Sequence, residues 1–561
     1  MKANQMKVSL LAIAVCLLLI MGCSSKSSSS SSASPSAAGT PSASVSASVS
    51  DGQAKQIASP SWKTDTSACK VTWFVAYDWY GKKFSPETNE FDKWVLNETG
   101  CSIEFQTGDT DKLNVLISTD SLPDVVTFDA NTSQRTLLEN SGKLLPMNKL
   151  INDYAPDFVV PKSMIDWYTA PDGNWYAFTN FYYGDDNVAA NKGFYETHNQ
   201  NFARKDILDQ IGMKADDMRT KEGFIKALRT VKEQGVTYAG QKMLPYAVLM
   251  NDKADEQMAL QFGASMETKD GKYQSIYRAP EYLEALEFYN QLYNEGLLTD
   301  ESFTMKKDQM EQKVASGELF ATTRWTNVSI SRGTLYGTDP NAQFLYAGLM
   351  RGDNHDRVAV LGQNNAGWAA TMITKNAKQP DRIIQLLSFM SQNEFTLNHE
   401  WGIGAYQLAD GHVVQDEAMA KIKQEQPAEW AAKYVSDLSW MMDYSVIQGT
   451  FPEPKTVFDL DTVARTRDAQ VEIYDDKPFA ATAPIGGSEE AAIQSRVQEY
   501  VKQALGRIVT AGSTEECEKQ YNAMMTELDN LGLQKLETYQ DTKFQENKQK
   551  LGLTFAHPFN R

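Results

Sequence analysis

The sequence lacks the residue spacings that metal, redox and nucleotide sites require. Its five cysteines form no CxxC pair, and its five histidines occur in no HxxxH or HExxH spacing. It contains no Walker sequence and no GxSxG motif, and Gly402-Ile403-Gly404 is without the third glycine of a dinucleotide-binding loop. We therefore expect no bound metal, no cofactor and no catalytic motif of these classes.

Positive charge is also scarce. The chain has 54 lysines and arginines against 72 aspartates and glutamates, which gives a formal net charge of −18. Such a chain has little cationic charge with which to neutralise nucleic-acid phosphates or anionic lipids. We therefore expect no nucleic-acid partner, and a neutral solute fits better than a charged polymer.

No hydrophobic run is long enough to make a stable membrane span. The segment 8–21 is apolar apart from Ser9, and as a helix it would cover roughly 21 Å of the ~30 Å hydrocarbon core. After two lysines, this length indicates a secretory signal peptide over 1–22. The following Gly22-Cys23 resembles a bacterial lipobox, in which the cysteine becomes the diacylated N-terminus. The alternative is an uncleaved membrane anchor, and either one places the rest of the chain outside the cell.

A serine-rich segment separates Cys23 from the first recognisable strand. Residues 24–50 contain 15 serines with alanine, proline, glycine and threonine. Such a composition cannot bury apolar surface, so we predict that 23–65 is a disordered tether. It would hold a folded domain above the outer face of the membrane.

From Cys69 onward the sequence alternates predicted strands and helices. The strands are expected at 70–77, 101–106 and 124–129, and the helices between and after them at 88–98, 111–118, 136–140 and 147–151. This alternation predicts an α/β fold with a parallel sheet covered on both faces. Ligands of such sheets bind at the carboxyl ends of the strands, where Asp78, Trp79, Asp129 and Asn131 occur.

Cys69 and Cys101 each precede a predicted strand. If those strands are neighbours, the two thiols lie side by side at the amino edge of the sheet. Outside the cell this arrangement permits a disulfide, worth about 3–4 kcal/mol for a loop of this size. Two separate buried thiols fit the sequence equally well, and Cys517 would stay unpaired.

Five passages in the same order resemble extracellular solute-binding proteins related to maltose-binding protein. They are 113–128 (LNVLISTDSLPDVVTF), 201–212 (NFARKDILDQIG), 289–300 (YNQLYNEGLLTD), 315–321 (ASGELFA) and 369–392 (AATMITKNAKQPDRIIQLLSFMSQ). The resemblance implies a periplasmic-binding-protein-like fold with two discontinuous α/β lobes, a hinge and a cleft between the lobes. By analogy the amino-terminal lobe would hold 66–180 and 372–408, the other lobe 181–371 and 409–545, and 546–561 would be a surface tail.

The resemblance also indicates where a solute would bind. Sugars need flat aromatic faces to stack on and planar polar groups that take hydroxyls. Besides the residues after the first and third strands, we expect Tyr182, Arg324, Trp325 and Trp368 to line the cleft. Trp325 follows the small-residue turn where the family carries a stacking tryptophan.

We therefore expect a lipid-anchored binding protein, not an enzyme. It would capture an oligosaccharide or a related solute as a monomer at the extracytoplasmic face of the cell membrane, and deliver it to the permease of an ABC transporter. A surface glycosidase or lyase is one alternative, although no motif proposes its paired carboxylates. A peptide-binding or sensor-associated binding protein is the other.

Overall fold

The computed structural model describes residues 59–81, 83–184, 186, 197–329, 331–363, 365–442, 450 and 457–561. The predicted signal peptide (1–22), the predicted lipidation site Cys23 and the predicted tether as far as residue 58 lie outside these ranges. By its internal contacts the chain from residue 57 onward forms one compact unit. Within the described ranges, no helix has the length and hydrophobicity needed to cross a membrane.

The folded region begins earlier than the sequence predicts. The predicted tether extends to residue 65, yet the short helix η1 (Ser61–Lys63) is already part of the fold. Ser61 is buried, and its amide donates a 2.9 Å hydrogen bond to Asp157 Oδ2. The Trp62 ring lies 5.6 Å from that of Phe389. The tether prediction is therefore wrong over 59–65, because Trp62 finds a partner that is distant in the sequence.

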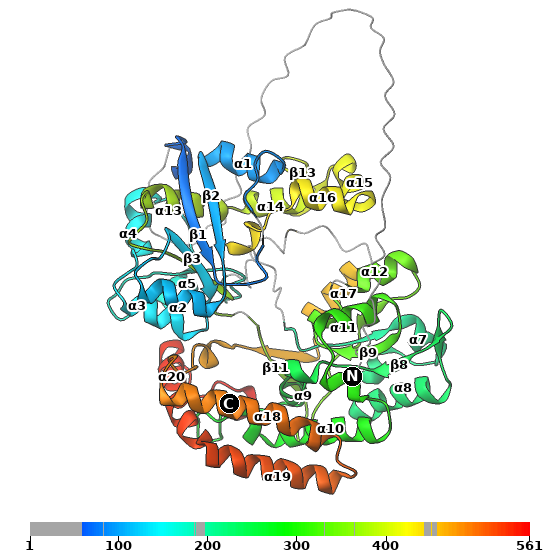
Figure 1. Ribbon diagram of the computed structural model, residues 1–561. Coiled ribbons are helices and arrows are strands. Elements are labelled where there is room, and N and C mark those ends of the chain that lie inside the picture. The colour runs from blue at the N-terminus through cyan, green and yellow to red at the C-terminus, as the bar shows by residue number, and fades with distance from the viewer. Residues whose placement is uncertain are drawn as a thin grey trace, which may run out of the picture. The chain divides into compact units, whose positions relative to one another are not determined.

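The first sheet has five strands in the order β2-β1-β3-β12-β4. Figure 1 labels the first three of them, β1, β2 and β3. Their bounds are β1 Cys69–Val75, β2 Cys101–Thr107, β3 Val125–Asp129, β4 Phe178–Thr179 and β12 Ala369–Ile373. The first three strands are parallel, whereas β12 runs antiparallel to β3 and β4. The α/β prediction is confirmed, but the sheet is mixed because β12 returns from a distant part of the chain.

The first four helices of this first lobe follow the predicted positions within a few residues. They are α1 Glu90–Thr99, α2 Thr110–Ser118, α3 Ser133–Asn140, α4 Met147–Tyr154, α5 Lys162–Tyr168, α13 Pro380–Met390 and α14 Asn393–Trp401. Local chemistry fixes the ends of α1: the Asn89 side chain accepts a 3.0 Å hydrogen bond from the Asp92 amide. At its other end Gly100 has φ +70°, and an added Cβ would lie 2.2 Å from the Thr66 carbonyl oxygen.

The second sheet is also mixed, with the strand order β10-β5-β9-β8. These strands are β5 Asn201–Arg204, β8 Leu244–Tyr246, β9 Leu319–Thr323 and β10 Phe344–Tyr346. Only β8 and β9 are parallel. The helices of this second lobe are α7 Lys205–Gln210, α8 Lys221–Glu233, α9 Ala254–Phe262, α10 Pro280–Asn294, α11 Lys307–Ala315, α12 Ser331–Thr338, α18 Glu489–Val509, α19 Thr514–Leu531 and α20 Leu533–Leu551.

Short strand pairs and helices complete the described fold. The pairs are β6 Thr237–Tyr238 with β7 Gln241–Lys242, β13 Tyr406–Ala409 with β14 His412–Gln415, and β11 Val358–Leu361 with β15 Val471–Tyr474. The remaining α-helices are α15 Glu417–Glu425, α16 Pro427–Tyr434 and α17 Val457–Thr466.

Each sheet has its own hydrophobic core. The first core draws on residues within 69–182, 366–395 and 438–442, and the second on residues within 203–350 and 493–536. Each lobe is therefore built from separate stretches of chain. The predicted boundaries at 180, 371 and 408 stay proposals. Because Leu438, Met441 and Met442 pack in the first core, we propose that the first lobe also includes 409–442.

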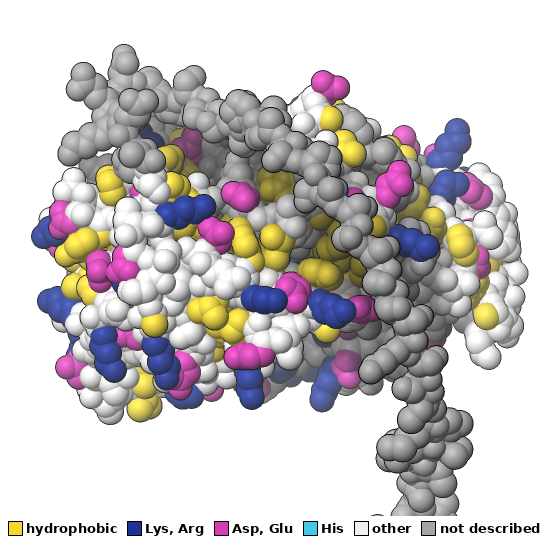
Figure 2. Space-filling model, turned by 90° about the horizontal axis from the view of Figure 1, so that it is seen from above, with side chains coloured by type: hydrophobic (Ala, Val, Ile, Leu, Met, Phe, Trp, Pro, Cys, Tyr) yellow, Lys and Arg dark blue, Asp and Glu magenta, His cyan; other side chains and the backbone are white. Residues whose placement is uncertain are grey.

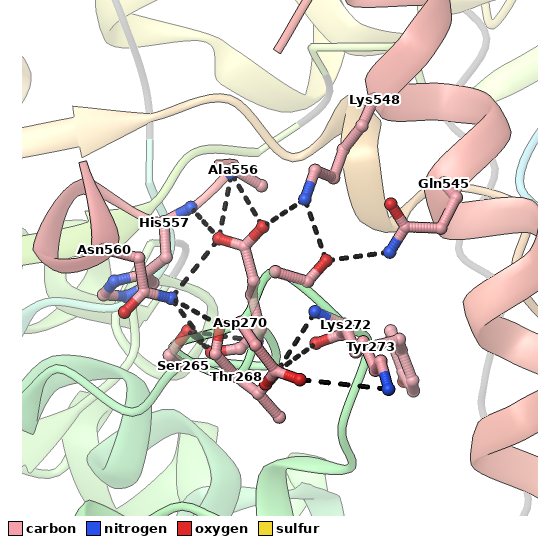
Figure 3. Close-up of polar contacts among 12 residues, drawn as sticks. Ser265, Thr268, Asp270, Lys272, Tyr273, Gln545, Lys548, Ala556, His557 and Asn560 are labelled. Atoms are coloured by element: carbon pink, nitrogen blue, oxygen red, sulfur yellow. Dashed lines mark hydrogen bonds and ion pairs between the residues drawn. The ribbon is translucent and has the colours of Figure 1, made fainter. Parts of the chain in front are cut away.

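The carboxyl-terminal residues are not the predicted surface tail. Glu267 is buried and forms a 2.7 Å ion pair with Lys548 at the end of α20. Its carboxylate also accepts hydrogen bonds from the amides of Ala556 and His557 (Figure 3). His557 is fully buried, and this burial lowers its pKa to about 3. The prediction for 546–561 is wrong because one buried carboxylate binds this polar segment to the second lobe.

A second buried carboxyl group makes stability depend on pH. Asp255 in α9 is 2% exposed and accepts a hydrogen bond from the Tyr282 hydroxyl. Burial, with the adjacent charge of Glu256, raises the pKa of Asp255 to about 7. Since this pKa exceeds the unfolded value of about 3.9, the folded protein binds the proton more tightly. The resulting stabilisation is lost as pH rises from about 4 to 7.

We predict that Asp255→Asn removes this pH dependence. Relative to wild type, the free energy of unfolding of the variant should rise by about 2–4 kcal/mol between pH 4 and pH 8, since each pKa unit is worth about 1.4 kcal/mol. Urea unfolding at several pH values measures it. Asp410→Asn, in the exposed turn between β13 and β14, is the control. Parallel profiles for wild type and Asp255→Asn would contradict the assignment.

Candidate functional site

Four aromatic side chains gather at the carboxyl ends of β1 and β3. They are Tyr77, Trp79, Trp368 and Trp440, here called the aromatic cluster. The Tyr77 ring lies 5.3 Å from Trp79 and 5.0 Å from Trp368. Trp79 and Trp368 are stacked, 6.2 Å apart with planes 12° from parallel, and Trp440 lies 5.5 Å from Trp79. The cluster offers several flat faces at one edge of the first sheet.

Strand register explains why residues so distant in the sequence meet here. β12 is antiparallel to β3, with Ala369 paired to Asp129. The start of β12 therefore lies beside the end of β3, and the Ala130 amide donates a 2.8 Å hydrogen bond to the Trp368 carbonyl. β1 is parallel to β3, so the residues after β1 reach the same edge.

The cluster is open to solvent in part. Trp79 is 57% exposed, which is unusual for the largest apolar side chain. Tyr77, Trp368 and Trp440 are half-buried, and Tyr80 packs beneath Trp440 at 5.6 Å, 1% exposed. The buried rings hold the exposed ring in place, so a solute would meet a rigid apolar surface.

Polar groups lie beside these rings. Asp129 ends β3 and is half-buried, and burial raises the pKa of its carboxyl group. The Asn131 amide donates a 2.8 Å hydrogen bond to Asp129 Oδ1. Burial raises the pKa of Tyr77, and the charge of Asp129 raises it further, so the two side chains are close. A carboxyl group, an amide side chain and a phenol can pair with hydroxyl groups of a solute.

Asn180 connects the two tryptophan segments of the cluster. It is fully buried, and its side-chain amide donates to the Trp440 carbonyl. Its Oδ1 accepts a 2.7 Å hydrogen bond from the Ala369 amide, and its backbone carbonyl accepts one of 3.1 Å from the Trp368 amide. One asparagine thus fixes the backbone before β12 and the backbone of Trp440 relative to each other.

In the second lobe, the predicted residue Trp325 lies in the short helix η6 (Trp325–Asn327) after β9. Its half-buried ring lies 4.0 Å from the Arg465 guanidinium and 4.6 Å from that of Arg332. Arg332 is buried and paired with Asp461, and burial lowers its pKa. Trp325 is therefore a packed ring with cations against it, and not an open stacking platform in this structure.

Arg324, next to it, is held by its own lobe. Its Nη1 donates a 3.1 Å hydrogen bond to the Asp252 carbonyl and forms an ion pair with the Asp252 carboxylate. Its backbone has φ +87°, a conformation that non-glycine residues rarely adopt. Backbone strain of this kind gathers at functional sites.

The structure brings together part of the predicted site. Trp79, Trp368, Asp129 and Asn131 meet at one edge, with the exposed Asp78 beside Trp79. Tyr182 does not join them. It is fully buried in the first core, and burial raises its pKa. The prediction of Tyr182 as a solute contact is therefore wrong, because its ring packs in the first core.

Sequence reasoning missed Tyr77, Trp440 and Asn180. Tyr77 had a signal, since it stands one residue before Asp78 at the end of a predicted strand. Trp440 and Asn180 had none, because their positions depend on contacts with residues more than 180 positions away along the chain.

A pocket of about 640 Å³ lies elsewhere, on the second lobe between α8, α10 and the start of α19. Five carboxylates and one lysine line it, and its only aromatic side chain, Phe288, is 4% exposed. Hydrated carboxylates without an exposed ring are poorly suited to stacking. The aromatic cluster is therefore the better candidate.

Charged side chains of both signs are mixed over the surface. Figure 2 shows one face, on which lysines and arginines lie among aspartates and glutamates, with hydrophobic side chains in small groups between them. A nucleic-acid-binding surface carries its cations together in one patch. The described part of this face is mixed in charge.

The chain is similar to a known protein family. The family model described as "Bacterial extracellular solute-binding protein" matches residues 81–396. No curated protein gives a significant match.

Solved structures match over most of the chain. The Streptococcus pneumoniae ABC-transporter substrate binding protein FusA in complex with kestose is 17% identical, with a TM-score of 0.63, and the match covers 86% of this chain and 99% of that one. An HMO binding ABC-transporter associated solute binding protein from Bifidobacterium longum infantis is 15% identical, with a TM-score of 0.62 and coverage of 85% and 98%. These similarities establish the fold.

We predict that Asn180→Ala loosens the aromatic cluster. Losing its two side-chain hydrogen bonds, to the Trp440 carbonyl and from the Ala369 amide, should lower the free energy of unfolding by about 1–3 kcal/mol. It should also weaken the near-ultraviolet circular dichroism of the coupled tryptophans. Asn522→Ala, at an exposed position of α19, should change neither. An unchanged spectrum for Asn180→Ala would show that the asparagine does not position the rings.

Proposed function

The chain belongs to the bacterial extracellular solute-binding protein family, the non-enzymatic binding proteins of ABC transporters, and from this premise we propose that its solute is an oligosaccharide. The observation that carries the proposal is the aromatic cluster, with Asp129 and Asn131 beside it. The protein would hold the sugar between its lobes and deliver it to an ABC permease.

The cluster matches what a sugar ring requires. A pyranose has one apolar C–H face, and each stacked aromatic ring contributes about 0.5–1.5 kcal/mol beyond area burial. Trp79 and Trp368 lie parallel and 6.2 Å apart, and Tyr77 and Trp440 extend the apolar surface. Several rings in one cluster favour a solute with more than one sugar unit over a monosaccharide.

Asp129 supplies the polar side of the proposed site. Burial raises the pKa of its carboxyl group. The same buried surroundings strengthen a hydrogen bond between this carboxyl group and a solute hydroxyl. A sugar hydroxyl can donate to Asp129, while the side chain of Asn131 can both donate and accept. This pairing would fix the orientation of a ring that stacking alone leaves free to rotate.

The second lobe would close over the solute with Arg324 and Trp325. A solute that contacts both lobes binds the closed state more tightly and so shifts the equilibrium towards it. Arg465 now lies against the Trp325 ring, so we expect this guanidinium to move aside or to bind a solute oxygen when the lobes close.

Proteins of similar structure support the same class of solute. One relative was solved with kestose, another is described as HMO binding, and a third, at a TM-score of 0.55, as an N-glycan transport solute binding protein. Family membership leaves no support for the glycosidase or lyase alternative. A thermal-shift screen with oligosaccharides, peptides and polyols would separate the proposed solute from a peptide or a sensor ligand.

We predict that Trp79→Ala weakens binding of the oligosaccharide found in that screen about tenfold, which corresponds to about 1.4 kcal/mol of lost stacking. Its melting temperature should not fall, because the ring is 57% exposed. Isothermal titration calorimetry gives the affinity. Tyr154→Ala, at an exposed tyrosine of α4, is the matched control and should bind as wild type does. Equal affinities for Trp79→Ala and wild type would remove the aromatic cluster from the site.

We further propose that the protein acts as a monomer anchored by a lipid on Cys23. We predict that Cys23→Ser abolishes incorporation of labelled palmitate and moves the protein from the membrane fraction to the medium, because one thiol carries the diacylglyceryl group. Cys517→Ser, at a buried cysteine of α19, should stay in the membrane fraction. Retention of Cys23→Ser in the membrane would favour an uncleaved hydrophobic anchor.

A further inference from the structure

We propose that Cys69 and Cys101 form a disulfide that ties the amino end of β1 to the edge strand β2. The two residues are register partners in these parallel strands, each the first residue of its strand. Neighbouring parallel strands lie about 4.8 Å apart, within the Cα separations that disulfides span. In this structure both cysteines are free thiols.

The surroundings hold the two sulfurs together. Cys69 is 4% exposed and Cys101 is 1% exposed, and the two are paired residue to residue in the sheet. The Cys69 amide donates a 3.0 Å hydrogen bond to the Gly100 carbonyl, and the Cys101 amide donates one of 3.1 Å to Thr99 Oγ1. Because both backbones are fixed and both side chains leave the sheet on the same face, bond formation needs little movement.

A buried arginine stands beside the pair. The Arg382 guanidinium lies 3.8 Å from Cys101 Sγ. It also donates to the carbonyls of Ser67 and Thr99, which precede the two cysteines, and pairs with Asp65 at 3.1 Å. A nearby cation favours the thiolate form, and the adjacent Cys101 together with Arg382 lowers the pKa of Cys69. A buried cation beside two neighbouring cysteines favours thiol–disulfide exchange at this pair.

The oxidant is a disulfide, either of an extracytoplasmic thiol oxidoreductase or of a small molecule. One of the two cysteine thiolates attacks one sulfur of that disulfide and releases one thiolate, which leaves a mixed disulfide on that cysteine. The thiolate of the other cysteine then attacks the sulfur of the first cysteine and releases the second thiolate. The two protons of the cysteines end on the two released thiolates, so the oxidant is reduced to a dithiol. Both cysteines are buried once folded, so the exchange takes place during folding or on opening of the edge strand.

The cross-link would strengthen the edge of the sheet where the chain enters it. β2 is an outer strand and pairs only with β1 among the described strands. The chain that leads from Cys23 enters this sheet at β1, directly after η1, so a pull through a lipid anchor reaches this edge once the contacts of η1 give way. This consequence rests on the proposed anchor. The aromatic cluster lies at the other end of β1, about 20 Å away along seven residues of strand. The disulfide and the solute site are therefore separable.

Peptide mapping of the exported full-length protein tests the proposal directly. The protein is alkylated in denaturant without reduction and digested with trypsin. We expect one cross-linked species that joins 64–70 (TDTSACK) to 94–112 (WVLNETGCSIEFQTGDTDK) and that separates into its two peptides on reduction. Cys517, whose pKa burial raises to about 12, should be recovered alkylated and is the internal control. Recovery of both peptides in alkylated form, with no cross-linked species, would overturn the proposal.

Hydrogen exchange tests the structural effect. Reduction should speed the exchange of β2 amides on the order of 100-fold, since a loop of this length restrains the opened chain by that amount. The exchange of α8 in the second lobe, and oligosaccharide affinity, should stay unchanged. Cys69→Ser/Cys101→Ser should exchange at the fast rate with or without reductant. If reduction leaves the exchange of β2 unaltered, the two thiols carry no cross-link.

Discussion

The antiparallel pairing of β12 with β3 is the constraint on which the rest of the structure depends. β12 returns to the first lobe after the chain has built the second sheet, and it is held there by a buried hydroxyl pair, Thr127 and Thr371, at 2.8 Å. Trp73 Nε1 donates a 2.8 Å hydrogen bond to the same Thr127 hydroxyl. A one-residue slip would bury the wrong side chains and break this network, so the register is tightly specified. That register places Trp368 beside Asp129, and with it the candidate site.

Because of the same return, each lobe is built from separate stretches of chain with its own core, so the chain passes between the lobes more than once. Near the crossing, Asn365 Nδ2 donates a 3.1 Å hydrogen bond to the Tyr183 carbonyl, and the Asn365 amide donates one of 3.0 Å to Asp476 Oδ1. Three segments of chain are therefore linked at one point. Relative motion of lobes with separate cores is then a change of a few backbone angles at such crossings. Hinge motion of this kind suits a protein that encloses a solute without altering it.

Most strands and helices of the first lobe could be predicted from local sequence patterns. The β-branched and aromatic run of β1, the helix α1 and the residues after β1 and β3 all lie where their patterns predict. The predictions that were wrong concern residues whose positions depend on contacts with distant parts of the sequence. Tyr182 lies in an aromatic run that reads like a binding loop, yet it fills the core. The segment 546–561 is polar and looks like a surface tail, yet Glu267, almost 300 residues earlier, binds it. Trp440 had no local signal at all, since Asn180 places it.

The central claim is that an oligosaccharide binds at the aromatic cluster and contacts both lobes. The most direct measurement is the crystal structure of the protein with the oligosaccharide that stabilises it most. We expect intact glycosidic bonds, sugar rings stacked on Trp79 and Trp368, a hydroxyl on Asp129, and contact with Arg324 or Trp325 of the second lobe. Electron density for a sugar bound away from the aromatic cluster, held by one lobe alone, or cleaved at a glycosidic bond would contradict the account.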